Sequence, residues 1–479
     1  QDGPGPLNGV LVAVGSFQVT NRNPNIAFYN GTTWSGLATT TPVLAGSVKV
    51  LTTWDPDGDG PLQPRLLLAG NFTIGGVQAY LATWDGQAWE NLSGNFVGTI
   101  DQLVFFDADG TGPNLPEIFV HTTGSATIGG TSVPGAVARF DGTTWRSVLP
   151  STFSGAIYKM RSADLDYDPS TPDEMLFMGS FTYSTGGTNF DGLIAHGVVR
   201  WDGQRFATFN ELESGEVQTM TLFDFDGDGP QLPKVVVGGD MLAAGNLKNA
   251  GVACWDGSHW SQVGDGLVTR RALSSSHALL SLLAFDPDGT GPQTAQLYAG
   301  GYFKLQGGAA AIHVARLNGS AWEAVPLPPN RSGADQVEVQ ALRSWDPDGD
   351  GPGNPWLVVA FGAWTADQGT PVIAWDGETW HELGALPLAG TYNWLNDCRV
   401  WDPDGDGPQT PLLAVCGSFS GVSGRPGMLL WNGQTWNPMA GMDYFTSNGM
   451  GLTTFDFDMD GPATPELVCS FQATGGSAL

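Results

Sequence analysis

The chain has 479 residues and a formal net charge of −29 at pH 7, which arises from 48 acidic and 19 basic side chains. This charge excludes a nucleic-acid partner, because binding to phosphates depends on Lys and Arg. No apolar run approaches the roughly 20 residues of a membrane-spanning helix, so the sequence predicts no membrane insertion. A strongly acidic surface keeps a large protein soluble. Together with the low Lys content, it leads us to expect an extracellular or cell-surface location.

An acidic loop recurs along the whole chain. Its clearest copy is Asp55-Pro-Asp-Gly-Asp-Gly-Pro61, which is followed by an apolar run ending at Gly70. Further copies, spaced 52 to 62 residues apart, start at Asp107, Asp164, Asp224, Asp286, Asp346, Asp402 and Asp456. Repetition with this period indicates units that share one continuous core, so we expect residues 1–479 to form a single domain.

Each repeat contains four short runs of β-branched, aromatic and aliphatic residues. In the first clear unit these runs cover residues 48–54, 66–72, 79–84 and 89–92, and Gly, Asp and Pro bound them. Such runs predict β-strands, which we call A, B, C and D. The acidic loop then joins A to B.

A second recurring motif joins strands C and D. It consists of an aromatic or Leu residue, Asp-Gly or Asn-Gly, two further residues and another aromatic residue. Asp-Gly and Asn-Gly favour tight hairpins, and we expect the flanking aromatic side chains to pack in the core. The motif occurs eight times and includes 12 of the 18 Trp residues, at positions 29–34, 84–89, 140–145, 201–206, 255–260, 317–322, 375–380 and 431–436.

Four-stranded antiparallel units of this length predict a β-propeller, without the Gly-His and Trp-Asp signature of WD40 repeats. Counting strands gives eight blades, with strands from the two ends of the chain sharing one blade. In this scheme the last strand A (449–455) lies directly inside the first strand B (9–17). Residues 466–471 then form a surplus strand B. This strand could displace the N-terminal one, pack outside the ring or belong to an incomplete ninth blade.

The predicted strand order separates the loops onto two faces. The A–B and C–D turns share one face, and the variable B–C and D–A loops share the other. Binding sites favour variable loops on a rigid scaffold, so we expect a protein or glycan ligand on the second face or at the mouth of the central channel. The longest of these loops cover residues 125–134, 184–192, 268–272 and 326–332.

Six of the acidic loops carry Asp at positions one, three and five, an arrangement that brings hard oxygen ligands around Ca²⁺. These loops resemble the FG-GAP repeats of integrin alpha-chain propellers, and the resemblance implies calcium sites between strands A and B. The candidate ligands are Asp55, Asp57, Asp59, Asp164, Asp166, Asp168, Asp224, Asp226, Asp228, Asp346, Asp348, Asp350, Asp402, Asp404, Asp406, Asp456, Asp458 and Asp460.

The acidic loops also depart from the FG-GAP pattern. Position nine, a carboxylate in that family, is occupied by Gln63, Leu232 or Thr410, and two copies have Thr111 or Thr290 at position five. The alternative is that Asp-Pro-Asp-Gly forms a turn without metal, held by Asx hydrogen bonds. The loop and the Trp-Asp-Gly hairpin also resemble secreted bacterial repeat propellers of unassigned function.

Arg161, Arg343 and Arg399 occupy one equivalent position, three residues before the acidic loop. They could form a basic cluster that holds an anion in the channel, or each could pair with a neighbouring acidic loop. Cys398 and Cys416 lie on strands A and B of one blade, so they could form a cross-strand disulfide or remain buried thiols.

The recurring motifs all have a structural explanation, so we expect a non-catalytic binding or surface-structural module rather than an enzyme. The rival is a propeller-type glycosidase or polysaccharide lyase, which needs two acids about 5–10 Å apart. The acids that break the repeat are Asp191, Glu211, Glu213 and Glu216. A third possibility is a self-assembling surface protein, in which the surplus strand B offers an edge to a neighbouring copy.

Overall fold

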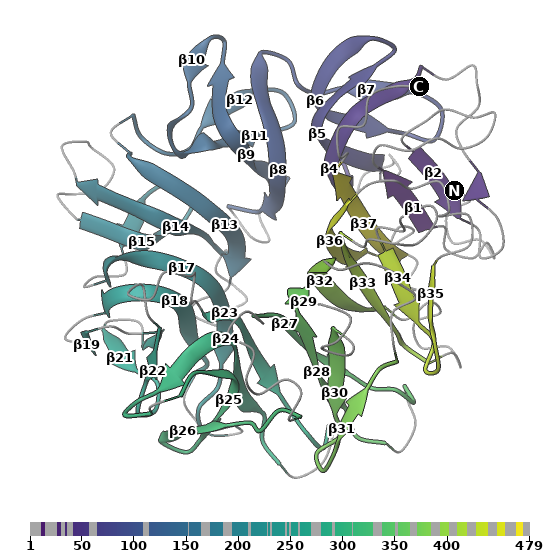
Figure 1. Ribbon diagram of the computed structural model, residues 1–479. Helices are drawn as coiled ribbons and strands as arrows, with labels where there is room; N and C mark the ends of the chain where they lie inside the picture. The colour runs from purple at the N-terminus through teal and green to yellow at the C-terminus, as the bar shows by residue number, and fades with distance from the viewer. Residues whose placement is uncertain are drawn as a thin grey trace.

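The computed structural model (Figure 1) describes a ring of small β-sheets. The described residues are 11–14, 26–29, 34–35, 42–56, 65–108, 115–151, 153–163, 173–184, 194–208, 212–227, 229, 232–244, 247–248, 251–256, 259–269, 279–289, 293–308, 310–328, 338–349, 353–364, 371–384, 393–401, 410–418, 428–438, 448–455 and 466–472. Apart from β-strands and loops, the described residues contain one 3-10 turn, η1 (Pro134–Ala136). Among the described residues, no helix is long and apolar enough to span a membrane.

Seven consecutive segments of the chain each form an antiparallel blade of four main strands, which confirms the predicted all-β propeller. The innermost strand A is β4 (Leu44–Trp54), β8 (Phe96–Phe106), β13 (Gly155–Ala163), β17 (Leu212–Phe223), β23 (Leu279–Phe285), β27 (Val339–Trp345) or β32 (Asn393–Trp401). Strand B is β5 (Arg65–Ile74), β9 (Glu117–Ile128), β14 (Glu174–Ser184), β18 (Lys234–Ala244), β24 (Gln296–Leu305), β28 (Trp356–Phe361) or β33 (Leu412–Ser418).

The outer half of each blade is the predicted Asp-Gly hairpin. Strand C is β6 (Val77–Trp84), β11 (Val137–Phe140), β15 (Ile194–Trp201), β20 (Val252–Trp255), β25 (Ile312–Asn318), β30 (Val372–Trp375) or β34 (Met428–Trp431). Strand D is β7 (Trp89–Asn91), β12 (Trp145–Ser147), β16 (Phe206–Thr208), β21 (Trp260–Gln262), β26 (Ala321–Ala324), β31 (Trp380–Glu382) or β35 (Trp436–Pro438). Two-residue strands β10 (Thr131–Ser132), β19 (Leu247–Lys248), β22 (Leu267–Val268) and β29 (Ala363–Trp364) extend four of the sheets.

The ends of the chain meet in a sheet of a different kind. Its five strands, in spatial order, are β36 (Asn448–Phe455), β37 (Glu466–Gln472), β1 (Leu11–Val14), β2 (Ile26–Tyr29) and β3 (Trp34–Ser35). β37 pairs antiparallel with β36 and parallel with β1. This sheet contacts β32 and β33 on one side and β4 on the other, so it occupies the place between the last blade and the first.

Two predictions about ring closure are therefore wrong. The structure shows seven four-stranded blades, not eight, and the last strand A does not lie against the first strand B. Both copies of strand B are present, and β37 takes the position beside β36 and displaces β1 outward by one strand. Because β37 has a partner on each side, it offers no free edge, and this removes the basis for self-assembly through a surplus edge strand.

Every innermost strand carries a β-bulge at the same place in the repeat. The residue that the strand register skips at the bulge, on these strands and on β36, is Lys49, Asp101, Tyr158, Gln218, Leu280, Gln340, Asn396 or Met450. In β4 the bulge lies opposite Gly70, where an added Cβ would come within 2.3 Å of the Ser47 carbonyl oxygen. In β14 a Cβ on Gly179 would come within 2.1 Å of the Ala156 carbonyl oxygen. The close approach of two backbones explains the glycine that ends the apolar run after the acidic loop.

The hairpin aromatic residues form the core between blades, as predicted. Trp84 and Trp89, for example, have ring centroids 5.0 Å apart, and Trp431 and Trp436 have centroids 5.4 Å apart. The indole of strand D also donates a hydrogen bond to a backbone carbonyl beyond strand D of the preceding blade. The donor–acceptor pairs are Trp145 with Leu92, Trp322 with Val263, Trp380 with Pro326 and Trp436 with Leu383. These bonds fix the outer edge of each blade to its neighbour.

Of the two alternatives for Cys398 and Cys416, the structure shows buried thiols without a disulfide, and Cys254 is also a buried thiol. Cys416 pairs with Asp397, and Cys398 pairs with Val415. An offset of one residue sends two side chains to opposite faces of a sheet. Burial raises the pKa of the Cys398 thiol to about 12, as expected for a thiol that packs as a small apolar group.

Candidate functional site at the ring axis

The predicted calcium loops are described only in part. Asp55, Asp224, Asp226, Asp346 and Asp348 belong to the described residues. The remaining candidates, Asp57, Asp59, Asp164, Asp166, Asp168, Asp228, Asp350, Asp402, Asp404, Asp406, Asp456, Asp458 and Asp460, lie outside them. Among the described residues, no group of three or more His, Cys, Asp and Glu side chains could hold a metal ion.

In three of the described acidic loops, the first carboxylate binds its own backbone. Asp224 and Asp346 accept hydrogen bonds at Oδ1 from the amide two residues later, at 3.1 Å in both loops, and Asp286 does the same at 3.2 Å. Asp348 Oδ2 accepts a further bond from the Gly353 amide at 3.0 Å. These are the Asx bonds of the turn alternative.

The first two Asp residues of the loop also lie close enough to affect each other's charge. Burial raises the pKa of Asp346, and the adjacent Asp348 carboxyl raises it further. Burial and the Asp288 carboxyl likewise raise the pKa of Asp286. A cation between two such carboxylates would relieve their repulsion, so the described residues fit a part of an oxygen ligand set for Ca²⁺.

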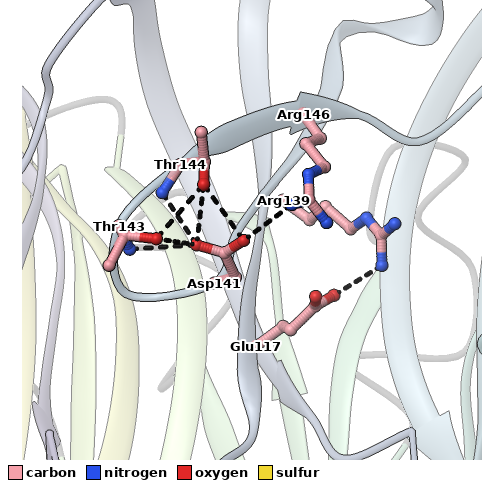
Figure 2. A network of polar contacts seen from close by, with 6 residues as sticks. All are labelled: Glu117, Arg139, Asp141, Thr143, Thr144 and Arg146. Carbon is pink, nitrogen blue, oxygen red and sulfur yellow. Dashed lines mark hydrogen bonds and ion pairs between the residues drawn. The ribbon is translucent and has the colours of Figure 1, made fainter.

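The C–D hairpins use their Asp side chains in the same local way, as Figure 2 shows for the blade of β11 and β12. Asp141 Oδ1 accepts hydrogen bonds from the Thr143 and Thr144 amides at 3.0 and 2.7 Å, and Asp141 Oδ2 pairs with Arg146 at 3.2 Å. Burial raises the pKa of Asp141, but the bonds from Thr143 and Thr144 outweigh it and hold the pKa at about 2. These carboxylates stabilise turns.

The ring axis collects charged and polar side chains from different blades. The residue after the bulge accepts a hydrogen bond from the inner strand of the next blade in three places. Gln102 Oε1 accepts from the Met160 amide, Thr219 Oγ1 from the Leu282 amide and Ser281 Oγ from the Leu342 amide, at 3.2, 3.2 and 3.1 Å. These bonds connect neighbouring inner strands at a constant height along the axis.

At the same height, Arg343 joins β27 to β32. Its Nε donates to the Cys398 carbonyl at 2.7 Å, its Nη1 to the Leu342 carbonyl at 2.8 Å and its Nη2 to Asp397 Oδ1 at 2.8 Å. Arg399 Nε lies 3.6 Å from Asp397 Oδ2. Arg343 and Arg399 thus share the Asp397 carboxylate of inner strand β32, and this described pairing is not with an acidic loop.

Lys159 on β13 belongs to the same group of charges. Burial lowers the pKa of Lys159, the Asp397 carboxylate opposes this, and Arg343 and Arg399 lower the pKa further. β13 and β32 lie on opposite sides of the ring (Figure 1), with three inner strands between them in either direction. The charges on β32 therefore influence the pKa of Lys159 from across the axis. We call Lys159, Arg343, Asp397 and Arg399 the axial cluster.

A second polar group lies on the blades of β4 and β8. Asp101, the bulged residue of β8, accepts a hydrogen bond from Thr123 Oγ1 at 2.7 Å and lies 2.6 Å from His121 Nδ1. Burial lowers the pKa of Lys49, and the Asp101 carboxylate opposes this. No local spacing in the sequence connects residues on separate blades, so no sequence motif marks Lys49, Asp101, His121, Lys159 or Asp397 as site residues.

The other predicted site residues lie on β13 and β17 or outside the described residues. Arg161 is exposed on β13, two residues after Lys159. Glu213 and Glu216 belong to β17, but their side chains, like all of Asp191 and Glu211, lie outside the described residues. Of the variable loops, the one at 125–134 is described throughout, whereas residues 185–192, 270–272 and 329–332 lie outside the described part.

No family model and no curated protein matches the chain. Among solved structures, the chain is similar to BBS1N crystallised in complex with ARL6DN, with 12% identity and a TM-score of 0.33 over 79% of this chain and 91% of that chain. It is also similar to the GH74 enzyme of Niastella koreensis, with 11% identity and a TM-score of 0.24 over 97% of this chain and 82% of that chain. The assignment as a β-propeller follows from the strand order and pairing described above.

Proposed function

We propose that the protein is a non-catalytic, exported β-propeller that binds a ligand at its axis and on the B–C and D–A loop face. The observation that carries this proposal is the contrast between two sets of charged groups. The described carboxylates of the turns bind their own backbone amides. At the axis, Lys159 of β13 and Arg399 of β32 lie on opposite blades and keep exposed surface.

Charged side chains that converge from separate rigid elements are typical of a ligand site. Asp397 is the acid of the axial cluster among the described residues, and it already pairs with two guanidinium groups. General acid–base hydrolysis of a glycosidic bond needs two carboxyl groups that flank the bond. A binding role therefore accounts for the axial cluster better than a glycosidase or lyase role does.

Calorimetric titration with neutral glycans, basic peptides and small anions tests the proposal, together with a polysaccharide hydrolysis screen. We expect binding without turnover, and weaker binding in Arg399→Gln. The hairpin variant Arg146→Gln serves as the matched control, because Arg146 is 54% exposed and pairs only with the Asp141 turn within the described residues. Measurable turnover would contradict the non-catalytic role. Equal binding by the wild type and both variants would contradict a ligand site at the axis.

We also propose that Ca²⁺ binds at one or more A–B loops and stabilises the folded ring. The support is the pair of close carboxylates in the loops of Asp286 and Asp346, where the pKa of the first Asp is raised. A ligand that binds only the folded state stabilises it, by about 2.7 kcal/mol at a concentration of 100 Kd. We expect the melting temperature to rise on adding millimolar CaCl₂ and to fall again with EGTA; an unchanged melting temperature would remove calcium.

A further inference from the structure

Two exposed apolar side chains lie in one acidic loop, the loop that joins β17 to β18. Phe225 is 37% exposed and Leu232 is 57% exposed. Single exposed apolar residues are common on protein surfaces. Two in one loop form a small patch, and an apolar patch bordered by polar groups is typical of a contact with another protein. We call Phe225 and Leu232 the apolar pair.

The turn itself does not require the apolar pair. The position of Phe225 holds Pro in the acidic loops of the next two blades, and the position of Leu232 holds Thr or Asn there. The three loops nevertheless share one turn. In each, the amide of the third residue donates to the first Asp at 3.1 or 3.2 Å, and the glycine that follows has a φ between +62° and +64°. The apolar pair is therefore a departure from the repeat that the conformation of the loop does not explain.

The ring of Phe225 is held from two sides. It packs against Phe223 at the end of β17, with centroids 4.9 Å apart and ring planes at 87°, and Lys234 Nζ lies 5.7 Å from its centroid. Phe223 and Lys234 are register partners. The apolar pair lies two residues beyond them, with one member on each arm of the loop. A side chain that is already ordered loses little conformational entropy when a partner covers it, so Phe225 can act as an aromatic anchor in an interface.

The surroundings of the apolar pair are acidic. Asp224 and Asp226 belong to the same loop. The loop between β23 and β24 in the next blade (Figure 1) carries Asp at the same two positions. The two loops are in contact, because a Cβ added to Gly227 would come within 2.7 Å of Thr294 Cγ2. Apart from Lys234, a partner on the apolar pair therefore meets mainly negative charge, and a second copy of the same acidic face would be repelled.

We propose that the apolar pair is a docking surface for a basic segment of another protein. Such a segment places an apolar side chain on Phe225 and Leu232 and its Lys or Arg side chains near the surrounding carboxylates. The surface lies among the A–B turns, so the inference goes beyond the ligand that we propose for the axis and the opposite loop face. Opposite charge speeds the encounter and selects basic partners, and burial of the apolar pair supplies affinity.

Fluorescence anisotropy of two short labelled peptides tests the inference on the purified full chain, in EGTA to keep the carboxylates free of Ca²⁺. One peptide contains Lys, Ser and a central pair of Leu residues, and the other has Ser in place of both Leu residues. We expect the Leu peptide to bind the wild type about tenfold more tightly than the Ser peptide, because it buries apolar surface on the pair. Both peptides should bind more weakly as the salt concentration increases.

Two variants carry the residues of equivalent loops and so keep the turn: Phe225→Pro and Leu232→Thr. We expect Phe225→Pro to weaken binding of the Leu peptide about tenfold, since it removes the aromatic anchor, and Leu232→Thr to weaken it less. Binding of the Ser peptide should not change in either variant. Leu115→Thr is the matched control, because Leu115 is 41% exposed at the equivalent position of the loop between β8 and β9, which lacks the Phe. It should bind both peptides like the wild type.

Circular dichroism and melting curves establish that each variant is folded before affinities are compared. The inference is overturned if the Leu peptide does not bind, if the two peptides bind equally, or if Phe225→Pro and Leu115→Thr have the same effect. Light scattering tests the other occupant of the surface. A wild-type oligomer that is lost in Phe225→Pro would assign the apolar pair to a second copy of the chain and would also overturn the inference.

Discussion

The bond between the Trp436 indole and the Leu383 carbonyl provides a direct test of how neighbouring blades are held together. Trp436 is 4% exposed, Leu383 is 3% exposed, and the indole is the only hydrogen-bond donor to this carbonyl within the described residues. Trp436→Phe keeps an aromatic ring but leaves a buried carbonyl unpaired, which costs about 1–3 kcal/mol. The smaller ring adds roughly 1 kcal/mol of lost apolar burial.

Trp322→Phe is the matched control for this experiment. Trp322 is 3% exposed and donates to the Val263 carbonyl at 2.8 Å, but that carbonyl also accepts from the Gly266 amide at 3.2 Å. The substitution removes the same atoms and leaves the acceptor with a partner. We therefore expect Trp436→Phe to lower the free energy of unfolding by about 1 kcal/mol more than Trp322→Phe, measured by urea denaturation. Equal losses would show that the indole bonds between blades contribute no more than ring packing.

Two other substitutions test the bulge and the hairpin. Gly179→Ala places a Cβ 2.1 Å from the Ala156 carbonyl oxygen, so we expect a loss of about 3 kcal/mol by urea denaturation. Gly76→Ala, with φ +84° and no atom within 4 Å, should cost about 1 kcal/mol, and a smaller loss for Gly179→Ala would contradict the tight bulge. Asp141 has a pKa lowered from 3.8 to about 2, so its stabilisation is complete above pH 3.8 and disappears as the pH falls towards 2. Asp141→Asn should lower the melting temperature more at pH 5 than at pH 2, where the carboxyl is half protonated, and an equal difference at both values would refute this assignment.

The sequence predicted the strands, the hairpins and the aromatic core well, because each depends on residues within one repeat. Asn432 is an example, because its side chain accepts hydrogen bonds from the same two backbone amides that Asp binds in other hairpins. The prediction of how the ring closes was wrong, because closure depends on competition between two copies of strand B. Both copies are compatible with a place beside β36. The sequence could not decide whether Cys398 and Cys416 face each other, because a shift of one residue in the strand register moves a side chain to the other face of the sheet.

The axial cluster brings together residues from different repeats, so no single repeat predicts it. A comparison of equivalent positions in the repeats does give a signal. Once the bulge fixes the register, the residue that follows it is Val50, Gln102, Lys159, Thr219, Ser281, Ala341 or Asp397 in the seven blades. Gln102, Thr219 and Ser281 bind the next inner strand. Lys159 and Asp397 are the charged exceptions among these seven positions, and the ring places them on opposite blades. A charged residue at a position that is neutral in the other blades needs an opposite charge nearby. For Lys159 that charge is Asp397 across the axis, and Asp397 also pairs with Arg343 and Arg399. The departure from the repeat at this one position is what singles out the axis for the proposed binding role.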